Sequence, residues 1–253
     1  FHEQKMVKKQ KVDYMGSGLL AVSLSLLMFL FVQGGISFSW LSLKSSLLII
    51  LLLVFVFCFV KHENRTVEPV MPFSIWKNQS ILFANLTSLT TGIVLIGVSS
   101  YLPTFVQGVM EKSPMIAGFT LTAMSIGWPI ASFISGNMIL KIGYRTTCIT
   151  GGIFIIIGAL AFTFLPSHGY VFLAGSGSFL LGVGMGLTST AFIVSIQSTV
   201  GWEQRGAATA ANMFMRNLGN TIGAALLGGI LNNRLNAYYS QNENMDLNSV
   251  NEL

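Results

Sequence analysis

Residues 174–229, AGSGSFLLGVGMGLTSTAFIVSIQSTVGWEQRGAATAANMFMRNLGNTIGAALLGG, decide the fold class of this chain. They form two long, mostly apolar segments rich in small residues, joined by a short loop that carries Glu203 and Arg205. Each segment has glycines four residues apart, which places them on one helix face and lets a second backbone approach closely. We therefore expect packed helices inside a membrane bundle. The expected packing residues are Gly182, Gly186, Gly219 and Gly223.

The composition of the whole chain also indicates a membrane protein. Of its 253 residues, 52% are hydrophobic and 9% are charged, whereas a soluble domain carries about 25% charged residues. The mean hydropathy is +0.68. The net charge of +5 does not indicate a nucleic-acid partner, because the basic residues lie in short loops between apolar runs and mark topology there. The sequence predicts an all-α, multi-pass protein in a lipid bilayer.

Seven apolar runs are each close to the length of about 20 residues that a spanning helix needs. The predicted spans cover residues 15–32, 41–60, 81–106, 115–140, 147–165, 170–196 and 207–231. Asp13 precedes the first span as a candidate helix cap. The second span is apolar on every side and should face lipid, whereas the third and seventh carry polar residues. The polar segment 61–77, which contains Pro69 and Pro72, is the predicted domain boundary.

The basic residues of the loops predict the orientation of the spans. With the N-terminus in the cytoplasm, ten Lys and Arg residues fall in inside loops and three in outside loops, and Arg216 remains inside a span. Loops rich in Lys and Arg stay on the cytoplasmic side of a membrane. We therefore expect a cytoplasmic N-terminus for this chain in the plasma membrane.

A polar stripe on the seventh span is the strongest signal of a functional path. Asn212, Arg216 and Asn220 occupy successive i, i+4 positions, and such a stripe at membrane depth faces protein or water. An arginine at the centre of a span costs about 2.5 to 3.5 kcal/mol on insertion. Arg216 either lines a water-filled path or pairs with a carboxylate outside this chain, or it snorkels to the cytoplasmic interface. The sequence leaves both interpretations open.

The third and fourth spans supply the other path candidates. Asn85, Tyr101 and Gln107 lie in or just after the third span. Trp128 precedes Pro129 in the middle of the fourth, where proline kinks a helix. The Trp128 ring either stacks on a flat substrate or fills the helix junction at this kink.

The sequence offers no catalytic or metal-binding set. No span contains a carboxylate, and the three histidines (His2, His62 and His168) are expected at the terminus or in loops, without a second ligand at metal spacing. Catalytic and phosphate-binding motifs are missing as well. We expect neither an enzyme nor a metal or cofactor site, and a carboxylate that carries protons would lie outside this chain.

Three segments resemble one family. Residues 101–121, YLPTFVQGVMEKSPMIAGFTL, resemble a helix-loop-helix of the fourteen-helix drug/proton antiporters, the EmrB/QacA-type branch of the major facilitator superfamily. Residues 216–228, RNLGNTIGAALLG, are similar to the family's Arg-x-x-Gly-x-x-x-Gly helix. Residues 136–145, GNMILKIGYR, resemble the superfamily's cytoplasmic loop motif, although its acidic position is Leu140. The residues that match this motif are Gly136, Lys141, Gly143 and Arg145.

The resemblance implies a secondary transporter that exports drugs or other amphipathic compounds by alternating access, driven by protons. It implies that residues 1–66 are a cytoplasmic lead-in and an extra helix pair, and that residues 67–235 are the first five helices of the C-terminal bundle. Residues 236–253 would be an extracytoplasmic tail or loop before a last helix. The partners implied are the bilayer, a small lipophilic or amphipathic substrate, protons carried by residues outside this chain, and the N-terminal bundle of the same protein.

Two other functions stay possible at the level of the sequence. A transporter of this kind can carry an amino acid or another small metabolite in place of a drug. A seven-helix receptor matches the number of spans, but such receptors usually begin outside the cell, and the loop charges predict the opposite orientation.

Overall fold

The computed structural model describes residues 13–34, 38–39, 41–66, 73–165 and 170–241. In this part of the chain the regular structure is helical, apart from one isolated bridge between Gly34 and Phe38. The long helices are α1 (Tyr14–Gln33), α2 (Leu43–Glu63), α3 (Gln79–Gly108), α4 (Pro114–Thr163), α5 (Val171–Thr199) and α6 (Arg205–Gln241), with short 3₁₀ turns η1 (Phe73–Lys77) and η2 (Trp202–Gln204). The predicted all-α fold class is confirmed.

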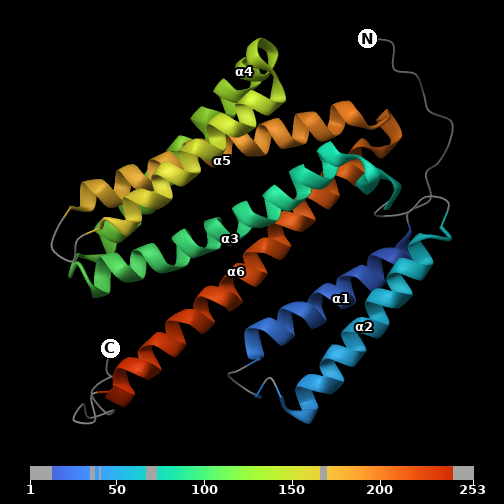
Figure 1. Cartoon of the computed structure of the whole chain (residues 1–253), viewed down its shortest axis with the longest axis horizontal. Coiled ribbons are helices and arrows are strands. Elements are labelled where there is room, and N and C mark those ends of the chain that lie inside the picture. The colour runs from blue at the N-terminus through green and yellow to red at the C-terminus, as the bar shows by residue number, and fades with distance from the viewer. Residues whose placement is uncertain (1–12, 35–37, 40, 67–72, 166–169, 242–253) are drawn as a thin grey trace.

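Gly143 divides α4 into two segments. It has φ +79° and ψ 168°, a conformation that glycine adopts without strain, inside an otherwise helical run of 50 residues. Figure 1 shows the chain turning back on itself within α4. The expected loop at 141–146 is therefore wrong, because helical residues continue on both sides of Gly143. The two segments correspond to the predicted fourth and fifth spans.

Polar side chains set where four of the helices begin. Asp13 caps α1, and its Oδ1 accepts a hydrogen bond of 2.8 Å from the Gly16 amide. Ser42, Asn78 and Ser113 cap α2, α3 and α4 in the same way. A side-chain acceptor at this position satisfies one of the amides that the first helical turn leaves unpaired. The predicted role of Asp13 as a cap is thus confirmed.

The helices pack as a hairpin and two pairs. Helix α4 packs most closely on α5, helix α3 packs along α6, and α1 packs on α2 (Figure 1). One apolar cluster, which includes Ile81, Ile196 and Ala208, joins α3, α5 and α6 where α3 and α6 begin. We call this the Gly143 end of the bundle and the opposite end, where α4 begins, the Pro114 end. Phe59 of α2 and Ala211 of α6 form a smaller cluster that joins the hairpin to the bundle.

Five described helices, α1 to α5, are long and apolar enough to cross a membrane. Most large apolar side chains of α2 are exposed, as a helix surrounded by lipid requires. Helix α6 has 37 residues, but its polar residues, which include the stripe, give it a lower mean hydropathy than the other five helices have. It also continues to Gln241, past the start of the predicted tail at residue 236.

Some predicted features lie outside the described residues. They are His2, His168, the breakers Pro69 and Pro72, and residues 242–253 of the predicted tail. His62 is described, and its predicted place in a loop is wrong because it belongs to the last turn of α2.

Candidate functional site

A buried amide cluster joins α3 and α6. The Nδ2 group of Asn212 on α6 donates to Oδ1 of Asn85 at 3.0 Å and to Oγ of Ser88 at 2.8 Å, both on α3. It also lies 3.4 Å from the carbonyl oxygen of Ala84. All three polar side chains are buried, where an amide without partners would be unfavourable by several kcal/mol. Asn85 and Asn212, both predicted path residues, therefore contact each other between the two helices.

Glycines bring α3 and α6 into backbone contact along this line. A Cβ atom added to Gly219 of α6 would collide with the carbonyl oxygen of Leu89 on α3. One added to Gly223 would lie 2.8 Å from Cα of Ile93. On α3, Gly92 faces the carbonyl oxygen of Arg216 in the same way. The two helices approach closely only because these positions carry no side chain.

Glycines also bring the backbones of α4 and α5 into contact at Trp128. A Cβ atom added to Gly186 of α5 would collide with the carbonyl oxygen of Trp128 on α4, and one added to Gly182 with that of Met124. From α4, a Cβ atom added to Gly127 would lie 2.7 Å from the Phe179 carbonyl oxygen of α5. Helix α4 thus lies directly on α5 at the residues that flank the Trp128 ring.

Arg216 reaches from one helix pair to the other. Its Cζ atom on α6 lies 5.9 Å from the centre of the Trp128 ring on α4. A guanidinium at this distance from an indole ring is attracted to the negative face of the ring, by about 0.5 to 2 kcal/mol depending on solvent exposure. The structure therefore brings together two of the predicted path residues that lie far apart in the sequence.

The contact between Arg216 and Trp128 lies near the middle of the first segment of α4 and within the first third of α6. Trp128 is 14 residues after Pro114 and 15 before Gly143. Arg216 is 11 residues after the first residue of α6, Arg205, which is about 16 Å along a helix axis. The hydrocarbon core of a bilayer is about 30 Å thick. The guanidinium is thus directed towards α4, and we propose that it faces a path or a partner at membrane depth.

Two amide atoms of the polar residues on α3 and α6 have no hydrogen-bond partner among the described residues. They are Nδ2 of Asn85, whose side chain is completely buried, and Oδ1 of Asn220, one turn beyond Arg216. Each unsatisfied group of this kind is unfavourable by about 1 to 3 kcal/mol. They leave one buried donor and one buried acceptor unpaired along the contact between α3 and α6.

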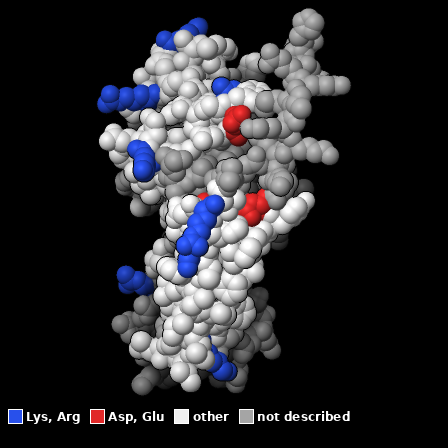
Figure 2. Space-filling view, turned by 90° about the vertical axis from the view of Figure 1, so that its right-hand side faces the viewer, with Lys and Arg blue, Asp and Glu red and all other residues white. Residues whose placement is uncertain are grey.

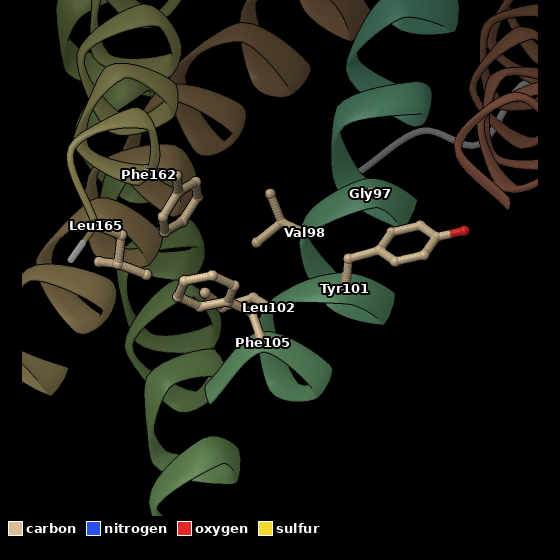
Figure 3. A pocket seen from close by; sticks show the side chains of 7 residues that line it. All are labelled: Gly97, Val98, Tyr101, Leu102, Phe105, Phe162 and Leu165. Carbon is tan, nitrogen blue, oxygen red and sulfur yellow. The ribbon is translucent and has the colours of Figure 1, made fainter. Parts of the chain in front are cut away.

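Tyr101 lines an apolar cavity of about 220 Å³ at the Pro114 end. Figure 3 shows Phe105, Phe162 and Leu165 gathered between α3 and α4, while the Tyr101 ring extends to the other side of α3. The Tyr101 hydroxyl lies 3.4 Å from where a Cβ atom on Gly228 of α6 would be. Val98 and Leu102 complete the wall. Such a cavity suits a small apolar group.

Gln107 and the loop-motif residues lie apart from this contact. Gln107 is exposed in the last turn of α3, and it is not part of the cavity wall. Lys141 and Arg145 are exposed on either side of the Gly143 turn, and a Cβ atom on Gly136 would meet open space. Leu140 occupies the acidic position of the motif and is 87% exposed. The loop motif is thus a surface feature around the Gly143 turn inside α4, and its residues begin eight positions after Trp128.

Ser88 and Gly92 belong to the candidate site, and sequence reasoning missed them. They follow Asn85 on α3 at three and seven residues, so they share its helix face. That spacing was a usable signal, but a serine and a glycine in a membrane helix are common. Only the position of α6 shows that Ser88 binds Asn212 and that Gly92 contacts Arg216.

A second polar contact, which sequence reasoning also missed, joins the start of α1 to the last turn of α2. Nε2 of His62 lies 3.0 Å from Oδ1 of Asp13 and 3.2 Å from the hydroxyl of Thr66. The hydrogen bond from the Gly16 amide, together with the contact to His62, holds the pKa of Asp13 below its ordinary value of 3.8. Among the described residues, no three His, Cys, Asp or Glu side chains gather in the manner of a metal site.

Comparisons with known proteins agree over most of the chain. A family model described as Major Facilitator Superfamily matches residues 6–224. The chain is 31% identical to Multidrug transporter protein MdtP of Bacillus subtilis (strain 168), over 79% of this chain and 37% of that protein. It is 31% identical to Multidrug resistance protein 3 of the same organism, over 92% of this chain and 46% of that protein. Multidrug resistance protein Stp of Mycobacterium tuberculosis is 26% identical, over 88% of this chain and 41% of that protein. The chain spans less than half the length of these curated relatives.

Proposed function

Because the chain belongs to the major facilitator superfamily, and so to a family of membrane transporters, we propose that it forms part of a drug exporter of the plasma membrane. The observation that carries this proposal is the similarity, over most of this chain, to proteins named for multidrug transport or multidrug resistance. Family membership makes the protein a transporter and not an enzyme. The substrate, its coupling to protons and the transport cycle are parts of the proposal.

The structure supports a lipophilic or amphipathic substrate. The cavity at Tyr101 is lined almost entirely by apolar and aromatic side chains, which bind apolar groups of different shape without requiring hydrogen bonds. The face of Trp128 offers a flat surface at mid-depth, next to a positive charge. An amino acid carrier would need partners for an ammonium and a carboxylate together, and the described helices α3 to α6 hold no acidic side chain for the ammonium; Glu63, in the last turn of α2, lies in the hairpin.

We propose alternating access as the mechanism. The described helices α3 to α6 form two closely packed pairs, and Arg216 with Trp128 crosses from one pair to the other. In secondary transporters two bundles rock around a site near the midplane. In this proposal the chain supplies one wall of that site, with Asn85, Asn212, Arg216 and Asn220 on it, and a second bundle of the same protein supplies the other. The carboxylate that carries protons lies in that second bundle.

The finer family assignment is part of the same proposal. We infer the fourteen-helix EmrB/QacA-type branch, with α1 and α2 as the extra helix pair and the rest of the chain as the first five helices of a C-terminal bundle. The hairpin supports this assignment because it contacts the bundle mainly through Phe59 and Ala211 at one end.

We also propose that the Gly143 end faces the cytoplasm. Figure 2 looks onto the right-hand side of Figure 1, where the turn between α5 and α6 lies, and it shows more basic than acidic surface. Basic loops stay on the cytoplasmic side during insertion. An epitope tag before Tyr14 should then be accessible to antibody only after the cells are permeabilised.

An efflux assay tests the proposed function. The complete reading frame that contains these residues is expressed in a drug-sensitive bacterium, and the rate of ethidium efflux is measured for Arg216→Ala and Asn220→Ala. We expect the rate to fall about tenfold or more, equivalent to about 1.4 kcal/mol, at an unchanged level of protein in the membrane. Asn217→Ala is the matched control, because Asn217 is exposed on the same helix.

The outcomes separate the alternatives. Ethidium efflux that stays at the wild-type rate in both variants would remove Arg216 and Asn220 from the path. Export of an amino acid or another metabolite without export of any lipophilic cation would overturn the proposed substrate class while leaving the transporter fold intact.

A further inference from the structure

The turn between α5 and α6 borders a second, open cavity of about 450 Å³. We call it the α5–α6 cavity, and its wall includes Gln197, Trp202, Arg205, Thr209, Ala210 and Met213. It lies at the Gly143 end, where the last turns of α5 and the first turns of α6 meet. None of these residues belongs to the path described above. We propose that this cavity binds the phosphate of an anionic phospholipid headgroup.

The charge in the cavity is the first step of the argument. Arg205 is half-buried, and its Nε atom is shielded from solvent without a hydrogen-bond partner among the described residues. The described acidic residue nearest in sequence is Glu203, and no carboxylate of the described residues lies within 4.0 Å of the guanidinium. A guanidinium is a fork of donors that matches the oxygens of a phosphate. The half-buried guanidinium therefore carries a charge that no described carboxylate pairs with, and an anionic ligand in the cavity supplies the partner.

The position of the cavity is the second step. Trp202 is 74% exposed, and its ring lies 5.1 Å from Cζ of Arg205. Exposed tryptophans gather at the level of lipid headgroups, because the ring is apolar and its N–H is polar. This residue begins η2, the short turn between the two long helices α5 and α6. The guanidinium and the indole thus lie where a headgroup lies.

The shape of the wall is the third step. Gln197 donates to the Thr209 hydroxyl at 3.1 Å, which leaves the amide oxygen of Gln197 free to accept from the glycerol part of a headgroup. Ala210 and Met213 follow on α6 towards the membrane, and both are exposed. The cavity is larger than a bare phosphate, and it passes from polar to apolar along the helix. This change from a polar to an apolar wall fits an amphiphile with an anionic head and an apolar tail.

Native mass spectrometry of the purified complete protein in dodecylmaltoside micelles tests the proposal, and it needs no transport assay. The probes are dioleoyl phosphatidylglycerol, dioleoyl phosphatidylcholine and inorganic phosphate. We expect phosphatidylglycerol to bind, phosphatidylcholine to bind at least about tenfold more weakly, and Arg205→Gln to lose about tenfold or more in affinity for phosphatidylglycerol. Arg145→Gln is the matched control, because Arg145 is exposed at the same end of the bundle.

Two further variants keep the test independent of folding. Arg205→Lys keeps the charge, and its affinity for phosphatidylglycerol should lie between those of wild type and Arg205→Gln. Ala210→Phe fills the cavity without changing charge and should abolish tight binding. The proposal is overturned if Arg145→Gln weakens binding as much as Arg205→Gln does, or if Ala210→Phe binds as wild type does. Absence of phosphatidylglycerol binding to the wild type would also overturn the proposal, as would displacement of the lipid by millimolar phosphate, which would assign the cavity to a free anion.

Discussion

The guanidinium of Arg216 on α6 lies 5.9 Å from the centre of the Trp128 ring on α4. The two residues belong to different helix pairs, since α6 packs along α3 and α4 packs on α5. Glycines hold both residues in place, because Gly92 contacts the backbone of Arg216 and Gly186 contacts the backbone of Trp128. A transporter that moves helices against one another would change this contact, so it is the first to probe.

A double-mutant cycle measures the coupling between Arg216 and Trp128. Trp128→Leu, Arg216→Gln and the double variant are compared by thermal unfolding of the purified protein in detergent. We expect a coupling of about 0.5 to 2 kcal/mol, because each single change removes the same cation–π contact. The combination of Trp128→Leu with Asn217→Gln should show no coupling. Strict additivity of Trp128→Leu and Arg216→Gln would mean that the contact contributes nothing.

The amide cluster should stabilise the packing of α3 against α6. Asn212→Ala leaves Oδ1 of Asn85 and the Ser88 hydroxyl without their shared donor. We expect a loss of about 1 kcal/mol, because hydrogen bonds between membrane helices contribute about 0.6 to 1.7 kcal/mol. The thermal midpoint of the purified variant is compared with that of Asn217→Ala on the exposed side of α6. Equal midpoints for the two variants would contradict a stabilising role.

Glycine substitutions on α6 should have opposite effects at two positions. Gly219→Ala places a Cβ atom against the Leu89 carbonyl oxygen, whereas a Cβ atom on Gly229 meets nothing within 4 Å. We expect Gly219→Ala to lower the thermal midpoint. Gly229→Ala should leave the midpoint unchanged or raise it, because alanine favours a helix over glycine by about 1 kcal/mol. Similar midpoints for the two variants would show that α3 and α6 are not in close contact at Gly219.

The apolar cavity at Tyr101 should affect the transport of lipophilic compounds. Val98→Phe fills part of the space of about 220 Å³, so we expect weaker binding and slower efflux of ethidium. Val109→Phe is the control, because Val109 is exposed just after the end of the same helix. Michaelis constants from efflux measurements at several ethidium concentrations check this. An unchanged constant for Val98→Phe would remove the cavity from the substrate path.

The cap of α1 should make a contribution that depends on pH. Asp13→Ala removes the acceptor of the Gly16 amide and should lower stability by about 0.5 to 2 kcal/mol at neutral pH. Because the pKa of Asp13 is lowered by folding, its charged form is favoured in the folded state. The greater stability of wild type over Asp13→Asn is therefore fully present well above pH 3.8. It is lost as the pH falls through the lowered pKa of Asp13 in the folded protein. Thermal midpoints of the three proteins between pH 3 and pH 7 check both parts. A difference that does not change with pH would contradict the role of the charge.

The sequence by itself determined the class of fold and the course of the helices. A backbone in lipid must satisfy its own hydrogen bonds, so an apolar run of about 20 residues forms a helix whatever surrounds it. The cap at Asp13 follows from local chemistry in the same way, because its acceptor and the Gly16 amide are three residues apart. The break between the fourth and fifth spans was also predictable, but its reduction to Gly143 alone was not, since a loop and a one-residue turn have similar composition.

Only the tertiary structure decided which faces meet. The spacing of Asn212, Arg216 and Asn220 places them on one side of α6, but it does not say which helix lies opposite. Asn212 binds Asn85 across 127 residues of chain, and Arg216 turns to Trp128 rather than to the helix end. These choices depend on where glycines let two backbones approach, and each such contact needs complementary positions on both helices. The residue pattern of one helix shows which of its faces can approach a neighbour. Which helix lies opposite depends on the matching face of that neighbour.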